Sequence, residues 1–172
     1  MKKFYHGSPD DGVTEILRST SEKQFVFWGM FFSDKEVAKS HATAHLYSVE
    51  VDEDNLADAR DFAYDNDAYE AIKESFGEPL EDEELFHDLI AGRETMWDVS
   101  EDISSEERNK LNELFGKVLG NYPGIEDYEL DWAFQSAAAY IADKLGYEGV
   151  WVLDEHGTSL IVTPGHKLHQ EK

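Results

Sequence analysis

The chain has 172 residues, 41% of them hydrophobic and 13% aromatic, which is enough to bury the core of one folded domain. It contains no cysteine, which excludes a disulfide framework and a thiolate nucleophile and suits a reducing cytoplasm. Its formal net charge is −23, so nucleic acid and anionic membranes repel it, and we expect basic partners and no direct binding to nucleic acid. Residues 1–12 lack the apolar run of a signal peptide, and no stretch is apolar enough to span a membrane, which favours a cytoplasmic protein.

Short β-strands are predicted in the first third of the chain. Lys3–His6 is a strand that closes on the turn-forming residues Gly7–Gly12. Phe25–Phe32 is aromatic and β-branched around Gly29, which is typical of a second strand or extended segment. Leu46–Val51 alternates as Leu-Tyr-Ser-Val-Glu-Val and predicts a third strand.

A helix is predicted between the second and third of these strands. Ser33 is a good N-cap, and Glu36 three residues later completes a capping box, which predicts a helix over residues 34–45. His41 and His45 would then stand one turn apart, a spacing that can hold a metal ion. No glutamate stands between them in a His-Glu-x-x-His arrangement and no third ligand is evident, so we predict no metal site.

The middle of the chain is helical in character and strongly acidic. Four segments have the helical pattern: Asp65–Phe76, Asp82–Ala91, Ser105–Leu119 and Tyr128–Leu145. The last has an alanine-rich centre, with Gly146 at its C-terminal stop. Asp52 to Glu107 contains 21 acidic and three basic residues. This segment is either a solvated face or a surface that docks on a protein which itself binds nucleic acid.

Two further strands are predicted near the end of the chain. Gly149–Leu153 and Thr158–Thr163 flank the turn Asp154–Gly157. Strands therefore lie towards both ends with helices between them, an order that favours an α+β fold over alternating βαβ units. No repeat, linker or low-complexity segment interrupts the pattern, so we expect a single domain over residues 1–172.

The first motif with possible chemistry is Tyr5-His6-Gly7-Ser8 at the end of the first strand. A histidine there can share a hydrogen bond with a sugar hydroxyl, and the glycine lets a planar carboxamide approach the backbone N–H and C=O. Taken alone, the motif favours a histidine that only caps the turn.

The second motif is Gly29-Met30-Phe31-Phe32-Ser33, which runs directly into the predicted helix. Aromatic faces at a strand end can enclose a flat, electron-poor ring such as a positively charged nicotinamide. The free N–H groups at the start of a helix can bind polar or anionic ligand atoms. By itself this motif also fits a core strand, with Ser33 acting only as a cap.

The third motif is Asp154-Glu155-His156, in the turn between the last two strands. When the bond between nicotinamide and ribose breaks, positive charge develops on the ribose. A carboxylate placed against that ribose would stabilise the charge, as in glycoside cleavage. In isolation the motif also fits an acidic turn that is merely hydrated.

Together and in this order, the motifs resemble those of the ADP-ribosyltransferase superfamily of the diphtheria-toxin and poly-ADP-ribose-polymerase type. That superfamily has a His-Gly-Thr/Ser strand, a Gly-x-Phe/Tyr-Phe-Ser/Ala strand leading into an alanine-containing helix, a Tyr-x-Val-x-Val strand and a terminal hairpin with the catalytic acid. The matching residues here are Tyr5–Ser8, Gly29–Ser33 with Ala38 and His41, Leu46–Val51 and Leu145–Val150. The resemblance implies a split β-sheet core with a helical insertion over residues 60–145, and NAD as co-substrate.

Within the superfamily the chain most resembles the phage anti-CRISPR ADP-ribosyltransferases that act on type I-F systems. The shared features are Phe4–Ser8, Ser40-His41, Asp154–Thr158 and Pro164-Gly165. That family modifies the surveillance-complex subunit that reads the PAM, so that DNA is no longer bound. The resemblance implies a mono-ADP-ribosyltransferase, a kind of glycosyltransferase, whose partner in the host cytoplasm is a basic CRISPR effector subunit.

The resemblance also implies roles for individual residues. Those expected to bind NAD are His6, Gly7, Ser8, Phe31, Phe32, Ser33 and His41. The superfamily commonly has a glutamate in its last strand, where this chain has Thr158-Ser159-Leu160. Asp154 in the preceding turn is therefore the expected catalytic acid, with Glu155 as the alternate. The nicotinamide ring is expected to lie against Phe31, and the ring facing it would come from His41, His45 or Tyr47.

Two other functions remain open on the sequence alone. A non-catalytic acidic mimic of nucleic acid would fit the charge, although it has no need of the ordered motifs. An ADP-ribosylating toxin would use the same chemistry on another host target. Dependence on NAD separates the mimic from the enzymes, because only an enzyme requires NAD to act on its partner.

Overall fold

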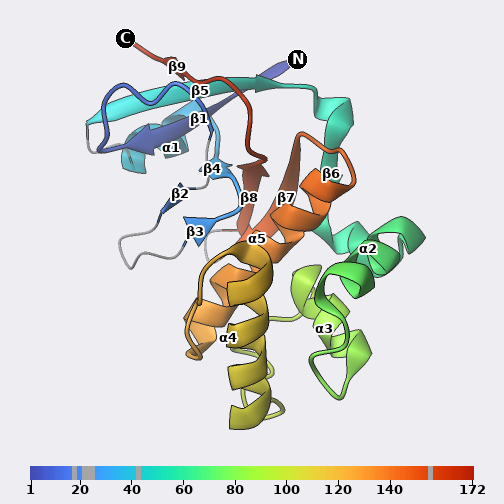
Figure 1. The fold of residues 1–172 in the computed structure, drawn as a ribbon. Helices are drawn as coiled ribbons and strands as arrows, with labels where there is room; N and C mark the ends of the chain where they lie inside the picture. The colour runs from blue at the N-terminus through green and yellow to red at the C-terminus, as the bar shows by residue number, and fades with distance from the viewer. Residues whose placement is uncertain (17–18, 21–25, 42–43, 155–156) are drawn as a thin grey trace.

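The computed structural model describes residues 1–16, 19–20, 26–41, 44–154 and 157–172, and Figure 1 shows their arrangement. Two main β-sheets come from the two ends of the chain, and a group of helices comes from its middle. This arrangement confirms the predicted α+β class. None of the described helices combines the length and apolar character needed to cross a membrane.

The first sheet has three strands in the order β1-β5-β9. β1 (Lys2–Ser8) pairs antiparallel with β5 (His45–Val51), and β5 pairs antiparallel with β9 (His169–Gln170) on its other edge. Tyr47 and Val49 of β5 are buried on the inner face. The sheet therefore joins the two ends of the described chain.

The second sheet has four strands in the order β4-β8-β7-β6. Their bounds are Met30–Phe32 (β4), Gly157–Val162 (β8), Gly149–Asp154 (β7) and Leu56–Asp58 (β6). β4 and β7 run antiparallel to β8, and β6 runs parallel to β7. A two-stranded pair, β2 (Ser19–Thr20) with β3 (Val26–Phe27), precedes β4.

The helices follow the predicted pattern closely. α1 (Lys35–His41) packs on β1. The insertion between β6 and β7 contains α2 (Asn66–Phe76), α3 (Glu83–Ile90), α4 (Ser105–Leu119) and α5 (Asp127–Lys144). Two 3₁₀ helices, η1 (Glu53–Asn55) and η2 (Ala59–Ala63), flank β6. The four predicted segments of the middle are thus confirmed as helices.

The four-stranded sheet is packed on both faces. In β8, Leu160 and Val162 belong to the hydrophobic cluster shared with the three-stranded sheet, whereas Ile161 belongs to the cluster shared with the helices. This alternation follows from the two-residue period of a strand. Figure 1 shows α2–α5 on one side of this sheet and β1 with β5 on the other. β4 forms one edge of this sheet, and Ser33, which follows β4, pairs with Tyr5 of β1.

The start of α1 differs from the prediction. Asp34 caps the helix, because its carboxylate accepts the N–H groups of Glu36 (3.0 Å) and Val37 (2.9 Å). Ser33 is still in extended backbone, since its N–H and C=O both bind Tyr5 at 2.9 Å. The capping residue is therefore one position later than predicted.

The predicted end of this helix is also wrong. α1 ends at His41, and His45 begins β5, where its Nδ1 lies 3.0 Å from Nε2 of Gln170. The two histidines therefore do not share one helix face. Phe25, the first residue of the predicted second strand, lies outside the described residues.

Candidate active site

A cavity of about 240 Å³ lies where β1, β4, α1 and the β7–β8 hairpin meet. It is lined by Tyr5, His6, Gly7, Phe31, Phe32, Ser33, Val37, Ala38, His41, Asp154 and Ser159. Seven of the nine predicted site residues are among them: His6, Gly7, Phe31, Phe32, Ser33, His41 and Asp154. Ser8 is buried elsewhere, and its Oγ accepts the N–H of Asp10 (3.1 Å). Glu155 lies outside the described residues.

His6 is held by a hydrogen bond from its ring to β4. Its Nδ1 lies 2.7 Å from the carbonyl oxygen of Phe31. A carbonyl can only accept, so Nδ1 carries the proton and Nε2 is the acceptor of the neutral ring. Burial lowers the pKa of His6 below its usual value of 6.5, although the Phe31 carbonyl opposes the shift. His6 is therefore neutral near pH 7 and offers an acceptor to a ligand hydroxyl.

Gly7 turns its backbone polar groups towards β4 and the cavity. The N–H and C=O of Tyr5 both bind Ser33, so they point away from β5. The backbone N–H and C=O of residues two positions apart on a strand point to the same edge of that strand. The N–H and C=O of Gly7 therefore also point away from β5. The carbonyl of Leu46, which is paired with Gly7, accepts the N–H of Glu171 (2.8 Å) and so faces β9. A planar carboxamide can therefore bind both backbone groups of Gly7.

The two phenylalanines of β4 pack in different directions. Phe32 is buried in the cluster between the sheets. The centres of the Phe32 and His6 rings lie 5.7 Å apart. Phe31 packs edge-on against Phe27, with ring centres 5.1 Å apart, on the side of the helices. Phe31 is only half-buried, so part of its ring is left for a ligand.

The turn before β4 is anchored to the longest helix. The backbone N–H of Trp28 donates to Ser136 (2.8 Å), and its ring Nε1 donates to Asp143 (2.8 Å). Gly29 follows with a φ of +102°, and a Cβ at this position would clash with the carbonyl oxygen of Val162. α5 and β8 together therefore fix the position of β4.

α1 contributes one face to the cavity. His41 stands about one helical turn after Val37 and Ala38, and all three line the cavity. Of the three rings predicted to face Phe31, only His41 lies here. Tyr47 is instead fully buried, and its hydroxyl donates to the backbone carbonyl of Asp10 (2.8 Å).

The carboxylate in the cavity comes from the β7–β8 hairpin. Asp154 is the last residue of β7 and pairs with Gly157 across the turn. The hydroxyl of Ser159 in β8 donates a hydrogen bond to this carboxylate. Within the described part of the chain, no group of three or more histidine, aspartate or glutamate side chains is placed to hold a metal ion.

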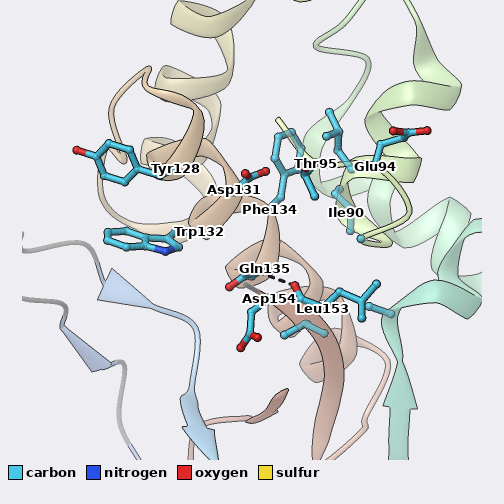
Figure 2. A pocket seen from close by; sticks show the side chains of 14 residues that line it. Ile90, Glu94, Thr95, Tyr128, Asp131, Trp132, Phe134, Gln135, Leu153 and Asp154 are labelled. Atoms are coloured by element: carbon cyan, nitrogen blue, oxygen red, sulfur yellow. Dashed lines mark hydrogen bonds between the residues drawn. The ribbon is translucent and has the colours of Figure 1, made fainter. Parts of the chain in front are cut away.

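A second cavity, of about 380 Å³, has Asp154 in common with the first. Figure 2 shows the side chains that line this second cavity. It lies between the helical insertion and the end of β7. Its lining residues are Ala59, Leu89, Ile90, Gly92, Glu94, Thr95, Tyr128, Asp131, Trp132, Phe134, Gln135, Val152, Leu153 and Asp154. Gln135 of α5 donates to the backbone carbonyl of Leu153 (3.3 Å), which ties the helix to the strand. Asp154 is the residue that the two linings share.

Comparison with known proteins identifies the family. The model of the anti-CRISPR Type I-F ADP-ribosyltransferase AcrIF11 family matches residues 2–171. The chain belongs to this family. A crystal structure described as that of an anti-CRISPR protein is similar in fold, with a TM-score of 0.60 and 21% sequence identity over 99% of this chain and 95% of the other. A comparison with curated proteins found no significant match.

Membership of this family confirms that the chain is an ADP-ribosyltransferase with an anti-CRISPR role. The family implies NAD as co-substrate and a protein target within the CRISPR system. The cavity suits such a co-substrate, because it combines an aromatic wall, a neutral histidine and an exposed backbone edge.

Four lining residues of the smaller cavity are absent from the predicted set: Tyr5, Val37, Ala38 and Ser159. Val37 and Ala38 are four and three residues before His41, so helical spacing could have indicated them. Ser159 stands in the strand where the superfamily commonly has its glutamate, which could have marked it as a polar partner. The larger cavity was not predicted, because its walls meet only in the folded chain.

Proposed function

We propose that the chain is a mono-ADP-ribosyltransferase that binds the nicotinamide end of NAD in the 240 Å³ cavity. We further propose that it transfers ADP-ribose to the PAM-reading subunit of a type I-F surveillance complex. The observation that supports the site is the meeting of His6, Gly7, Phe31 and Asp154 at one cavity, although they come from distant parts of the sequence. Each supplies a group that this ligand needs.

The binding roles follow from the geometry of β1 and β4. The C=O and N–H of Gly7 hold the carboxamide of nicotinamide through two hydrogen bonds. Phe31 covers one face of the ring, and His41 lies towards the other. The Nε2 of neutral His6 accepts a hydrogen bond from a ribose hydroxyl. Ser33 shapes the cavity through its backbone bonds to β1.

The catalytic role falls to Asp154, with Glu155 as the alternate acid. When the bond between ribose and nicotinamide breaks, its electron pair leaves with nicotinamide and the ribose becomes positively charged. The Asp154 carboxylate lies at the cavity wall and stabilises that charge. Ser159 fixes the carboxylate in place. A nucleophilic side chain of the target then forms the new bond to the ribose carbon and loses its proton.

The test measures transfer and NAD binding separately. The purified chain is incubated with NAD and a type I-F surveillance complex, and the subunits are weighed by mass spectrometry. The wild-type chain should add one ADP-ribose to the PAM-reading subunit. Asp154→Asn should lower the rate by about a hundredfold or more while keeping thermal protection by NAD. Glu113→Gln, an exposed change on α4, serves as the matched control. Full modification by Asp154→Asn would exclude Asp154 as the catalytic acid.

The net charge of −23 favours a second candidate function. An acidic mimic would occupy the DNA-binding groove of the complex without any reaction. Such a protein would block DNA binding equally well with and without NAD, and the Asp154→Asn variant would retain this effect. Inhibition that requires NAD and leaves a covalent adduct would exclude the mimic.

A further inference from the structure

The larger cavity carries a strong and one-sided charge. Three acidic residues, Glu94, Asp131 and Asp154, are among its lining residues, and none of the described residues that line it is lysine, arginine or histidine. Arg93 precedes Glu94 in the chain but pairs with Asp88 (3.0 Å) and lies over the ring of Tyr64. The cavity therefore attracts a cation.

Asp131 is the carboxylate nearest the helical core. Its Oδ1 accepts the N–H of Met96 (2.7 Å), and burial raises the pKa of its carboxyl group. A carboxylate that has lost part of its hydration gains most from a positively charged partner. Trp132 on the next position of α5 offers an aromatic wall to the same cation (Figure 2).

Three large apolar side chains that line this cavity or follow its lining residues in sequence are exposed. Trp97 is 79% exposed and directly follows Met96, which binds Asp131. Tyr128 and Leu153 line the cavity and are also exposed. Exposed tryptophan and tyrosine side chains next to a pocket are typical of protein interfaces, where they supply much of the binding energy.

The charge also argues against a role in binding the rest of NAD. The part of NAD beyond the nicotinamide ribose contains a diphosphate, which is anionic. Three carboxylates in one cavity repel such a group. The larger cavity therefore suits a different partner, one that meets the nicotinamide ribose at Asp154 from the opposite side.

We infer that the larger cavity, with Tyr128 and Leu153 exposed in its lining and Trp97 beside Met96, binds the segment of the target protein that presents the acceptor residue. A lysine or arginine of that segment enters the cavity beside Asp131, and Glu94 adds negative charge at the cavity's exposed side. Asp154 belongs to both cavities, so a segment held here brings its acceptor side chain to the reacting ribose. This inference rests on the proposed function.

The experiment removes the charge of the larger cavity while keeping its shape. In Glu94→Gln with Asp131→Asn, both side chains keep their size, and the new amide oxygen at position 131 can still accept the Met96 N–H. The matched control, Glu106→Gln with Glu113→Gln, removes two acidic charges from exposed positions on α4. A third variant, Trp97→Ala, tests the exposed tryptophan without disturbing the core.

The readouts separate docking of the target from binding of NAD. We expect the double cavity variant and Trp97→Ala each to raise the KM for the surveillance complex about fivefold to tenfold, with thermal protection by NAD unchanged. The KM of the α4 control should stay at the wild-type value. Added salt should raise the KM of the wild-type chain more than that of the double cavity variant.

Two results would overturn the inference. One is an unchanged KM for the double cavity variant, and the other is an equal rise in the α4 control, which would assign the effect to overall charge. Failure of the proposed function is distinguishable from both. In that case the wild-type chain itself would show neither protection by NAD nor modification of the complex.

Discussion

The hydroxyl of Ser159 donates a hydrogen bond to the carboxylate of Asp154, across the β7–β8 hairpin. The two residues lie on adjacent antiparallel strands, so the bond ties the end of β7 to β8. Asp154 is next to the turn, where a side chain would otherwise have more freedom. The position of the carboxylate is therefore set by the sheet.

Ser159→Ala should lower the rate of transfer and leave NAD binding nearly intact. The variant keeps the carboxylate but removes the bond that orients it, so we expect kcat to fall about tenfold with little change in the KM for NAD. Steady-state kinetics of the modification reaction measure both values. Thr158→Ala, an exposed neighbour in the same strand, is the control. Equal loss in the control would refute a specific role for Ser159.

NAD binding should weaken as the pH falls. Burial lowers the pKa of His6 below 6.5, so the neutral ring and its Nε2 acceptor are present at pH 7. Protonation at lower pH turns Nε2 into a donor and adds a positive charge beside a positively charged nicotinamide. We expect constant NAD affinity above pH 6.5 and a decline below the depressed pKa of His6, measured by calorimetry. A His6→Gln variant that kept the same pH profile would exclude this explanation.

His87→Phe should stabilise the fold. His87 is 5% exposed, stacks on Tyr69 with ring centres 4.4 Å apart, and neither ring nitrogen has a hydrogen-bond partner among the described residues. An unsatisfied buried polar group costs about 1–3 kcal/mol, so phenylalanine should raise the free energy of unfolding by a similar amount. Urea denaturation at pH 7 measures this change. A less stable variant would contradict the prediction.

The same histidine predicts how stability depends on pH. Burial lowers the pKa of His87, so below pH 6.5 the unfolded chain binds its proton more readily than the folded chain does. The free energy of unfolding should therefore fall as the pH drops through this range, and it should fall less in His87→Phe. His169→Gln, a change at an exposed histidine of β9, is the control, and an equal reduction of the slope in this variant would contradict the assignment to His87.

Gly29→Ala should be far more harmful than Gly77→Ala. Both glycines have a positive φ, +102° and +67°, which is unfavourable for alanine. At Gly77 a new Cβ meets open space, so we expect a loss of about 1 kcal/mol. At Gly29 the Cβ also clashes with the carbonyl oxygen of Val162, so we expect about 3 kcal/mol or more and weaker NAD binding. Equal losses in thermal unfolding would contradict this account of β4.

Features that depend on neighbouring residues were predicted well from the sequence. α4 has the predicted bounds because Ser104 and Glu107 form a capping box and Gly120 ends the helix in the left-handed region. Ser33 and Glu36 have the same spacing, yet Asp34 became the cap. The cause is a contact with Tyr5, far earlier in the chain, which the local pattern does not contain.

β6 and the larger cavity were not predicted, because both depend on contacts between segments that are far apart in the sequence. β6 has three residues within an acidic stretch and pairs Leu56 with Gly149, so no local signal marks it as a strand. The residues that line the smaller cavity were grouped beforehand only because their motifs follow the order of a known superfamily, since each motif alone carries no such signal. The larger cavity joins one face of α5 to the loop after α3, and only tertiary packing brings these together. The assignment of site residues and the single domain stay predictions.

The pairing of β4 with β8 has a consequence for the newly made protein. Phe31 finds its partner Ile161 about 130 residues later in the chain. The helical middle can form its local turns as it leaves the ribosome, but the hairpin that carries Asp154 is translated after this middle. A nascent chain therefore has no assembled cavity beside β4 until the hairpin emerges. The proposed transfer of ADP-ribose therefore requires β8, and a chain that stops before Gly157 should not bind NAD in the 240 Å³ cavity.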